Sequence, residues 1–192
     1  TQEDDLGQDE AYFVPEYLEF SDNPYLPMNI YVTSAMLGDM ELEAGDEIGV
    51  FDSNGVLESV DFGEPATTGE VLVGSALWFE QQQTIGCILS VDQSENNGPM
   101  LNGAVAGNSM VIKIWKQSLD MEFTPNVTYA NGSVGQFGET FTVISSLSVD
   151  GFGCTDESAC NYDSGATYND GSCWFPDTGC DCSGGEGAIS DC

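Results

Sequence analysis

The amino-acid composition changes abruptly near Val149, and this change constrains the fold more than any other feature. Before it, the chain of 192 residues is rich in valine, isoleucine, leucine and aromatic residues, whereas from Asp150 to Cys192 the one valine, leucine or isoleucine is Ile189. A segment without aliphatic side chains cannot build a hydrophobic core and needs covalent or metal cross-links. The sequence therefore predicts two modules of different construction.

The first module, residues 23–149, is predicted to be all β. Short runs rich in β-branched and aromatic residues alternate with Gly, Pro and Asn clusters, and no segment has the sustained period of an amphipathic helix. The predicted strands are 28–33, 47–52, 56–62, 70–79, 84–92, 109–117, 126–130 and 140–149. The sequence Asp-Ser-Asn-Gly at 52–55 predicts a hairpin turn between the second and third strands. Such strands favour an antiparallel β-sandwich, jelly-roll or immunoglobulin-like.

The second module, residues 150–192, is predicted to be small, strand-poor and rich in disulfides. It contains all but one of the seven cysteines, namely Cys154, Cys160, Cys173, Cys180, Cys182 and Cys192. This density is typical of extracellular disulfide scaffolds, and the pairing cannot be derived from the sequence. The remaining cysteine, Cys87, lies in an apolar run, where we expect a buried free thiol.

The charge of the chain excludes several functions. The sequence has 33 acidic residues, two lysines, no histidine and a formal net charge of −31. Because phosphate backbones and anionic lipids are bound by clustered Lys and Arg, we expect neither a nucleic-acid partner nor an acidic membrane surface. No stretch is long and apolar enough for membrane insertion. Without histidine there is no Ser–His–Asp unit, and no cleft signature accompanies the carboxylates, so we expect no enzymatic activity.

Clustered carboxylates in so acidic a chain predict calcium as a cofactor, the alternative being a solvated acidic surface. Oxygen-bearing side chains gather in three regions: around the strand 47–52, in a loop that resembles the start of a calcium-binding loop, and between the cysteines. The candidate ligands are Asp46, Glu47, Asp52 and Asn54 in the first region, Asp92, Ser94 and Asn96 in the second, and Asp156, Asn161, Asp163, Asn169 and Asp170 in the third.

Residues 1–22 combine an acidic start with an apolar, aromatic run that begins at Ala11. One interpretation is that this run forms an edge strand of its own sandwich. The other is that it acts as a donor strand, pairing with the exposed sheet edge of a second copy of the chain. Pro15 confines it to an edge or a bulge in either case. The candidate assembly residues are Tyr12, Phe13, Val14, Tyr17, Leu18 and Phe20.

One segment of the second module carries a family pattern. Residues 153–173 read GCTDESACNYDSGATYNDGSC. This segment resembles the GCTDxxACNYDxxATxxDGSC repeat of secreted, modular surface proteins of Bacteroidota-like bacteria. The stretches LEAGDEIGVFDSNG at 42–55 and GNSMVIKIWK at 107–116 look like the β-sandwich domains that accompany such repeats. The resemblance implies an extracellular or cell-surface location and an adhesive or matrix role, although this chain carries one repeat rather than a tandem array.

Together these features predict a non-enzymatic extracellular structural subunit. We expect it to assemble with copies of itself into a filament or surface layer through strand pairing, stabilised by calcium and disulfides. The alternative is a carbohydrate-binding or adhesive surface module that binds glycans through exposed aromatic side chains. The candidates for that role are Trp78, Trp115, Tyr129 and Trp174. Trp78 and Trp115 lie in apolar strands, where core packing is favoured.

Overall fold

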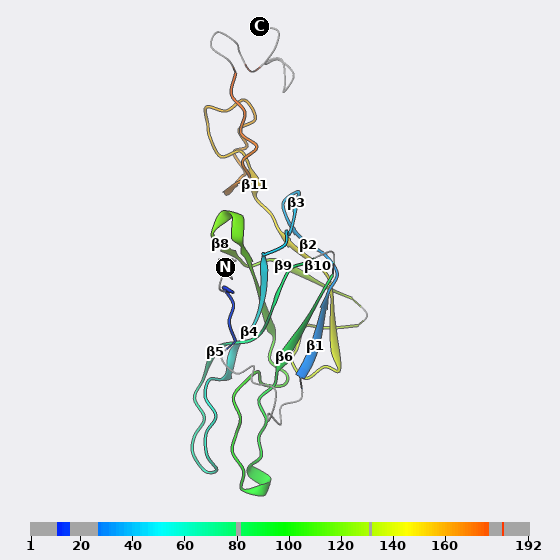
Figure 1. Cartoon of the computed structure of the whole chain (residues 1–192), viewed down its shortest axis with the longest axis vertical. Helices are drawn as coiled ribbons and strands as arrows, with labels where there is room; N and C mark the ends of the chain where they lie inside the picture. The colour runs from blue at the N-terminus through cyan, green and yellow to red at the C-terminus, as the bar shows by residue number, and fades with distance from the viewer. Residues whose placement is uncertain (1–10, 16–26, 80–81, 131, 177–181, 183–192) are drawn as a thin grey trace, which may run out of the picture. The chain divides into compact units, whose positions relative to one another are not determined.

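The structure is a computed structural model that describes residues 11–15, 27–79, 82–130, 132–176 and 182 (Figure 1). The described residues form two compact units. The first lies within residues 1–35 and 42–147, and the second lies within residues 36–41 and 148–192. The longer segment of the second unit begins at Ser148, next to the break in composition near Val149.

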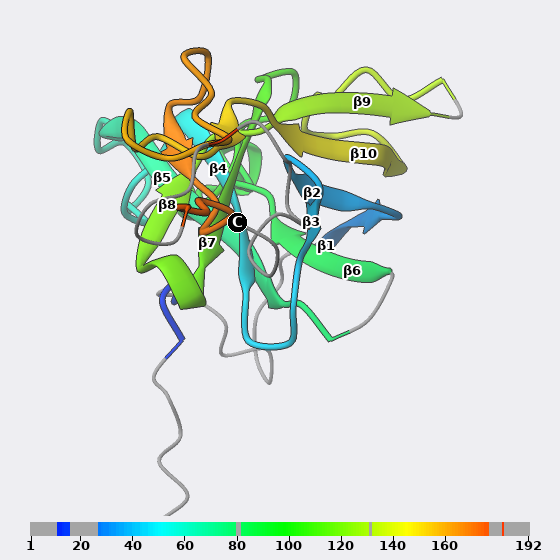
Figure 2. The same cartoon turned by 90° about the horizontal axis from the view of Figure 1, so that it is seen from above.

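The first unit is a β-sandwich of two sheets. In one sheet β6 (Gln83–Ile88) and β10 (Phe141–Val149) flank β1 (Pro27–Val32), and β9 (Asn126–Ala130) pairs with β10. The other sheet has the order β5 (Thr68–Leu77), β4 (Glu47–Val56), β7 (Met110–Lys116), β8 (Met121–Phe123). Figure 2 shows the two groups of strands as separate layers. The described residues contain no α-helix, only the 3₁₀ turns η1 (Ser94–Asn96) and η2 (Gln117–Leu119). The all-β prediction is therefore confirmed.

Alternation of apolar and polar residues builds the core between the sheets. In β1 and β7 every second residue is buried, as expected for strands with one face on a core. Ile30 of β1, Ile114 of β7 and Ile48 of β4 have no exposed surface. One pair departs from the antiparallel expectation, because β1 runs parallel to β10 with Asn29 opposite Phe141. A parallel pair needs a long connection, which nearly the whole first unit supplies here.

The predicted hairpin turn at 52–55 is wrong. Strand β4 continues through these residues to Val56, with a register shift between Asp52 and Gly55 where it pairs with β5. A Cβ atom on Gly55 would collide with Val71, so this glycine allows close approach of two strands rather than reversal of the chain. The chain reverses later, where Leu57 N donates to Thr67 O at 3.0 Å. The predicted strand 56–62 is consequently a loop beyond Val56.

A second glycine, Gly74 of β5, sets the approach of the two sheets. A Cβ atom there would lie 2.5 Å from Gly86 O and 2.8 Å from Cys87 Sγ. We expect Gly74→Ala to lower the free energy of unfolding by about 1–3 kcal/mol, because backbone atoms cannot move aside cheaply. Gly86→Ala is the matched control, since a Cβ atom there has no neighbour within 4 Å. Urea unfolding of both variants tests this, and equal stabilities would contradict it.

The thiol of Cys87 is buried and free, as the sequence predicted. Burial raises the pKa of this thiol far above its ordinary value. Because the thiolate is the reactive species, we expect iodoacetamide to leave Cys87 unmodified in the folded protein and to alkylate it in guanidinium. Mass spectrometry of the Cys87 peptide measures this, and alkylation of the folded protein at the rate seen in denaturant would contradict the prediction.

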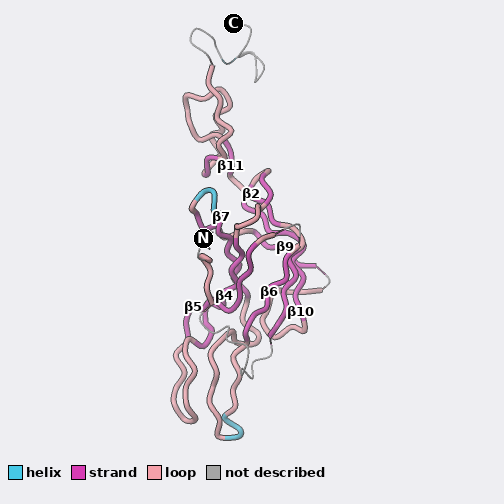
Figure 3. Tube along the Cα trace, in the orientation of Figure 1, coloured by secondary structure: helices cyan, strands magenta, loops and turns pink. Residues whose placement is uncertain are grey.

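The second unit contains mostly loops, as Figure 3 shows around β11. Its strands are short: β2 (Ala35–Leu37) and β3 (Met40–Glu41) form a hairpin, and β11 (Phe152–Gly153) pairs in parallel with β12 (Tyr168–Asn169). Two disulfides, Cys154–Cys173 and Cys160–Cys182, cross-link it. The prediction of a disulfide-rich, strand-poor module is confirmed for these four cysteines, whereas Cys180 and Cys192 lie outside the described residues.

Candidate docking site for residues 11–15

Residues 11–15 lie on the outer face of the sheet formed by β5, β4 and β7. The core face of β4 is made by residues such as Ile48 and Val50, so Glu47 and Gly49, which alternate with them, face outward. Register pairs Glu47 with Trp115 of β7 and Gly49 with Ser75 of β5, which places these side chains on the same face. Residues from three strands therefore form one surface for the N-terminal segment.

The backbone of the segment is held by two side chains of this surface. Tyr12 N donates to Glu47 Oε1 at 2.7 Å, and Phe13 N donates to Glu47 Oε2 at 2.8 Å. Ser75 Oγ donates to Phe13 O at 2.9 Å. Hydrogen bonds from N–H groups to a carboxylate are stronger than neutral ones. The buried carboxylate of Glu47 is thereby satisfied by two consecutive amides, and no ion pair joins it to a cationic group among the described residues.

Aromatic contacts complete the site. The Tyr12 ring stacks on Trp115 with centroids 3.8 Å apart and an interplanar angle of 2°. Phe13 is 4% exposed and meets Phe51 edge to face at 5.6 Å. A Cβ atom at position 49 would lie 3.0 Å from the Phe13 ring, so Gly49 makes room for it. The surface is thus shaped to hold two adjacent aromatic residues and their amides.

The structure describes three of the six predicted assembly residues. Phe13 is buried in the site, Tyr12 is stacked on it, and Val14 is 62% exposed. Residues 11–15 do not form a strand, so their contacts are made by side chains and a carboxylate rather than by a ladder of main-chain hydrogen bonds. Tyr17, Leu18 and Phe20 lie outside the described residues. The sequence indicated the segment but not the surface that binds it. Glu47, Gly49 and Trp115 come together on that surface only through the register in which β4 and β7 pair.

The predicted calcium ligands around β4 accept hydrogen bonds from N–H and O–H groups of this chain, and one of these bonds joins two of them, since Asn54 N donates to Asp52 Oδ1 at 2.9 Å. Asp46 contacts Lys116 and two main-chain amides. Asp52 Oδ2 accepts from Val105 N at 2.8 Å, and both its carboxylate oxygens accept from Asn108 Nδ2 at 3.0 Å. Asn54 Oδ1 accepts a hydrogen bond from Thr68 at 3.0 Å. In this structure the four residues form hydrogen bonds near the two ends of β4, and their side chains do not converge on a common point.

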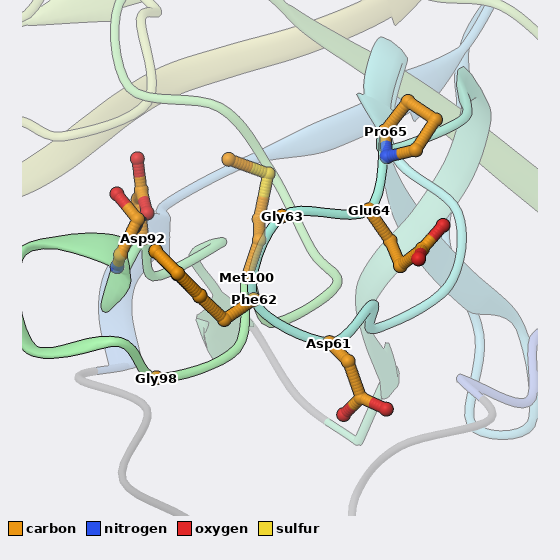
Figure 4. A pocket seen from close by; sticks show the side chains of 9 residues that line it. Asp61, Phe62, Gly63, Glu64, Pro65, Asp92, Gly98 and Met100 are labelled. Atoms are coloured by element: carbon orange, nitrogen blue, oxygen red, sulfur yellow. Dashed lines mark hydrogen bonds between the residues drawn. The ribbon is translucent and has the colours of Figure 1, made fainter.

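The second predicted calcium region lies in an open acidic pocket of about 370 Å³ (Figure 4). Asp92 and Ser94 line it together with Asp61 and Glu64 from the β4–β5 loop. Ser94 N donates to Asp92 Oδ1 at 2.9 Å, and this bond holds the pKa of Asp92 below its ordinary value. Figure 4 shows the three carboxylates pointing in different directions. The third predicted residue of this region, Asn96, lies in η1 and does not line the pocket.

In the second unit four of the five predicted ligands hold their own turns, and the fifth, Asn161, joins two separate segments. Asp156, Asp163, Asn169 and Asp170 each accept a hydrogen bond from the main-chain amide two residues later, and Asn161 Oδ1 accepts from Trp174 N at 2.9 Å. Hydrogen bonds from the side chain and then the amide of Ser158 lower the pKa of Asp156, and those from the side chain and then the amide of Ser172 lower the pKa of Asp170. Within the described ranges, no group of three or more Asp, Glu, Cys or His side chains is arranged to hold a metal ion.

Comparisons of the chain with protein-family models, curated proteins and solved structures found no match. Among the described residues no helix is long and apolar enough to cross a membrane. The candidate site must therefore be interpreted from its own chemistry.

Proposed function

We propose that the protein is a non-enzymatic, extracellular structural subunit that self-associates by docking residues 11–15 on the sheet face of another copy. One observation carries this proposal: the segment is held from outside by Glu47, Ser75 and Trp115 and is not a strand of the sandwich. A segment attached in this way binds a second copy through the same contacts that it makes with its own. Such head-to-tail exchange does not close on itself and generates a fibre.

Three further observations support an extracellular structural role. Two disulfides cross-link the second unit, which is typical of proteins in oxidising compartments. The resemblance of residues 153–173 to a repeat of secreted bacterial surface proteins points to the same location. Finally, a net charge of −31 opposes close association of copies unless cations such as Ca²⁺ screen it. Strand pairing by Tyr17, Leu18 and Phe20 stays a prediction alongside the docking of residues 11–15.

Light scattering and electron microscopy of the full chain, in calcium and then in EDTA, test the proposal. We expect polymers in calcium that the double substitution Tyr12→Ala with Phe13→Ala abolishes. Val14→Ala is the matched control, because Val14 is in the same segment but 62% exposed, and it is expected to polymerise normally. A wild-type monomer under both conditions, or undiminished polymers of the double variant, would overturn self-association through this site.

The acidic pocket favours a second function, glycan binding. Phe62, which is 53% exposed, lies in the wall of this pocket beside Asp61 and Glu64. An exposed aromatic ring next to carboxylates suits a sugar, because the ring packs on C–H groups while the carboxylates accept hydrogen bonds from hydroxyls. Trp78 is buried and Trp115 is covered by Tyr12, so neither offers a free platform. A glycan array with wild type and Phe62→Ala tests this function, which requires binding that the substitution removes.

A further inference from the structure

The core of the first unit ends in a buried lysine. The inward positions of β7 are Met110, Ile112, Ile114 and Lys116, so the last of them replaces an aliphatic residue by an ammonium group. The Lys116 side chain is 3% exposed, and that of Asp46 beside it is 2% exposed. The sequence has only two cationic side chains, and one of them is thus placed inside the protein. Burial of such a pair costs free energy that its mutual attraction does not fully return.

A carboxylate and two main-chain amides surround this pair. Lys116 Nζ lies 2.9 Å from Asp46 Oδ2 and 2.7 Å from Glu43 Oε2. Main-chain amides hold both oxygens of the Asp46 carboxyl group, since Gln117 N donates to Oδ1 at 3.0 Å and Glu43 N donates to Oδ2 at 2.7 Å. Amides placed in this way stabilise negative charge on a carboxyl oxygen under attack. The Glu43 side chain is 71% exposed, so it connects the buried pair to solvent.

We propose that Lys116 and Asp46 condense to an intramolecular amide that links β7 covalently to the residue preceding β4. Lys116 Nζ first gives a proton to Glu43, and Glu43 passes this proton to one oxygen of Asp46. The neutral amine then attacks Cγ of Asp46, the C–O bond to the protonated oxygen breaks, and a water molecule leaves with the second proton released by nitrogen. In sum one ammonium and one carboxylate become one amide and one water, with no change in net charge and no further reactant.

Two physical effects favour the condensation. The reacting groups are held in contact, which replaces a bimolecular encounter by a unimolecular step. The product also removes two charges from a site where both are more than nine-tenths buried. Lys113 provides the contrast, because its partners Glu70 and Glu122 are 54% and 35% exposed and lie 3.1 and 3.5 Å away. Water competes for that pair, and we expect no amide there.

Mass spectrometry of the full chain tests the inference after its disulfides are reduced and its thiols alkylated. We expect a mass that is lower than that of the sequence by one water. Trypsin gives the position, because the chain has no arginine and its two lysines are the only cleavage points. An amide at Lys116 blocks cleavage after that residue and leaves cleavage after Lys113 intact. A full sequence mass with cleavage at both lysines would overturn the inference.

Three variants separate this cross-link from other losses of water. Lys116→Arg keeps the charge but cannot form the amide, so it is expected to have the full sequence mass, whereas Lys113→Arg, the matched control, keeps the deficit. Loss of water that persists in Lys116→Arg would place the reaction elsewhere and refute the inference. Glu43→Gln keeps a polar, exposed side chain without a proton acceptor, and we expect it to slow the condensation at least tenfold in freshly refolded protein. The outcome does not depend on self-association of the chain.

Discussion

The substitution Asp46→Ala is expected to lower the free energy of unfolding of the first unit by about 3–5 kcal/mol. The reason is that Lys116 keeps its buried ammonium group but loses the one partner that is buried with it. Two main-chain amides, those of Glu43 and Gln117, lose their acceptor as well. Where the amide between Asp46 and Lys116 has formed, the variant loses this cross-link in addition. Denaturant unfolding, followed by the fluorescence of the buried Trp78, measures the difference.

The control is Glu70→Ala, which breaks the surface pair with Lys113. Glu70 is 54% exposed, so its loss is expected to cost no more than about 1 kcal/mol. If Asp46→Ala proved as mild as this control, the buried pair would not stabilise the fold. That result would also remove the physical ground for treating Asp46 as an organising residue of β4.

The pH dependence of this pair has a definite sign. Burial lowers the pKa of Lys116, but the hydrogen bonds with Glu43 and Asp46 outweigh burial and the pKa is raised above its ordinary value. A raised pKa in the folded state means that the ion pair stabilises the protein fully below about pH 10.4, the unfolded value, and less as the pH rises through the folded value. We therefore expect protein in which the amide has not formed to lose, as the pH rises into the alkaline range, the stability advantage that it has over Asp46→Ala. A chain with the amide has no such titration at Lys116.

The second large effect is expected from Cys154→Ala with Cys173→Ala, which removes the first disulfide. The bond closes a loop with a sequence separation of 19, and loss of a disulfide from a small extracellular domain typically costs about 2–5 kcal/mol. Few of the described apolar side chains of the second unit are buried; Val149 and Ala159 are two of them. We therefore expect residues 151–174 to unfold while the first unit remains folded.

Hydrogen exchange with mass spectrometry tests this result within one molecule. The amide of Asp163, which donates to Cys154 O at 2.9 Å, is expected to lose its protection. The amides of β4 and β7 in the first unit serve as the internal control, because the described residues of that unit contain no disulfide. Unchanged protection throughout residues 151–174 would mean that turns and the remaining disulfide suffice for this unit.

The sequence predicted most of the longer strands, and a strong period of two marks some of them. The run Met110–Lys116 alternates clearly, and its limits and inward face were predictable because a strand turns successive side chains to opposite faces. Strands of two or three residues, such as β3 and β8, are too short to show a period and were missed. The turn at 52–55 was mispredicted because Asn-Gly suits both a hairpin and a bulge, and neighbouring Val71 and Gly103 decide between them.

The sequence by itself determined the class of each part of this protein. Alternating apolar residues require a sheet with a buried face, and a cysteine-rich segment without aliphatic residues requires cross-links. Only the tertiary structure decided which groups meet: Cys154 with Cys173, Glu47 with the amides of residues 12 and 13, and Lys116 with Asp46. The physical reason is that composition and period act along the chain, whereas these contacts join residues far apart in it and depend on strand order and register.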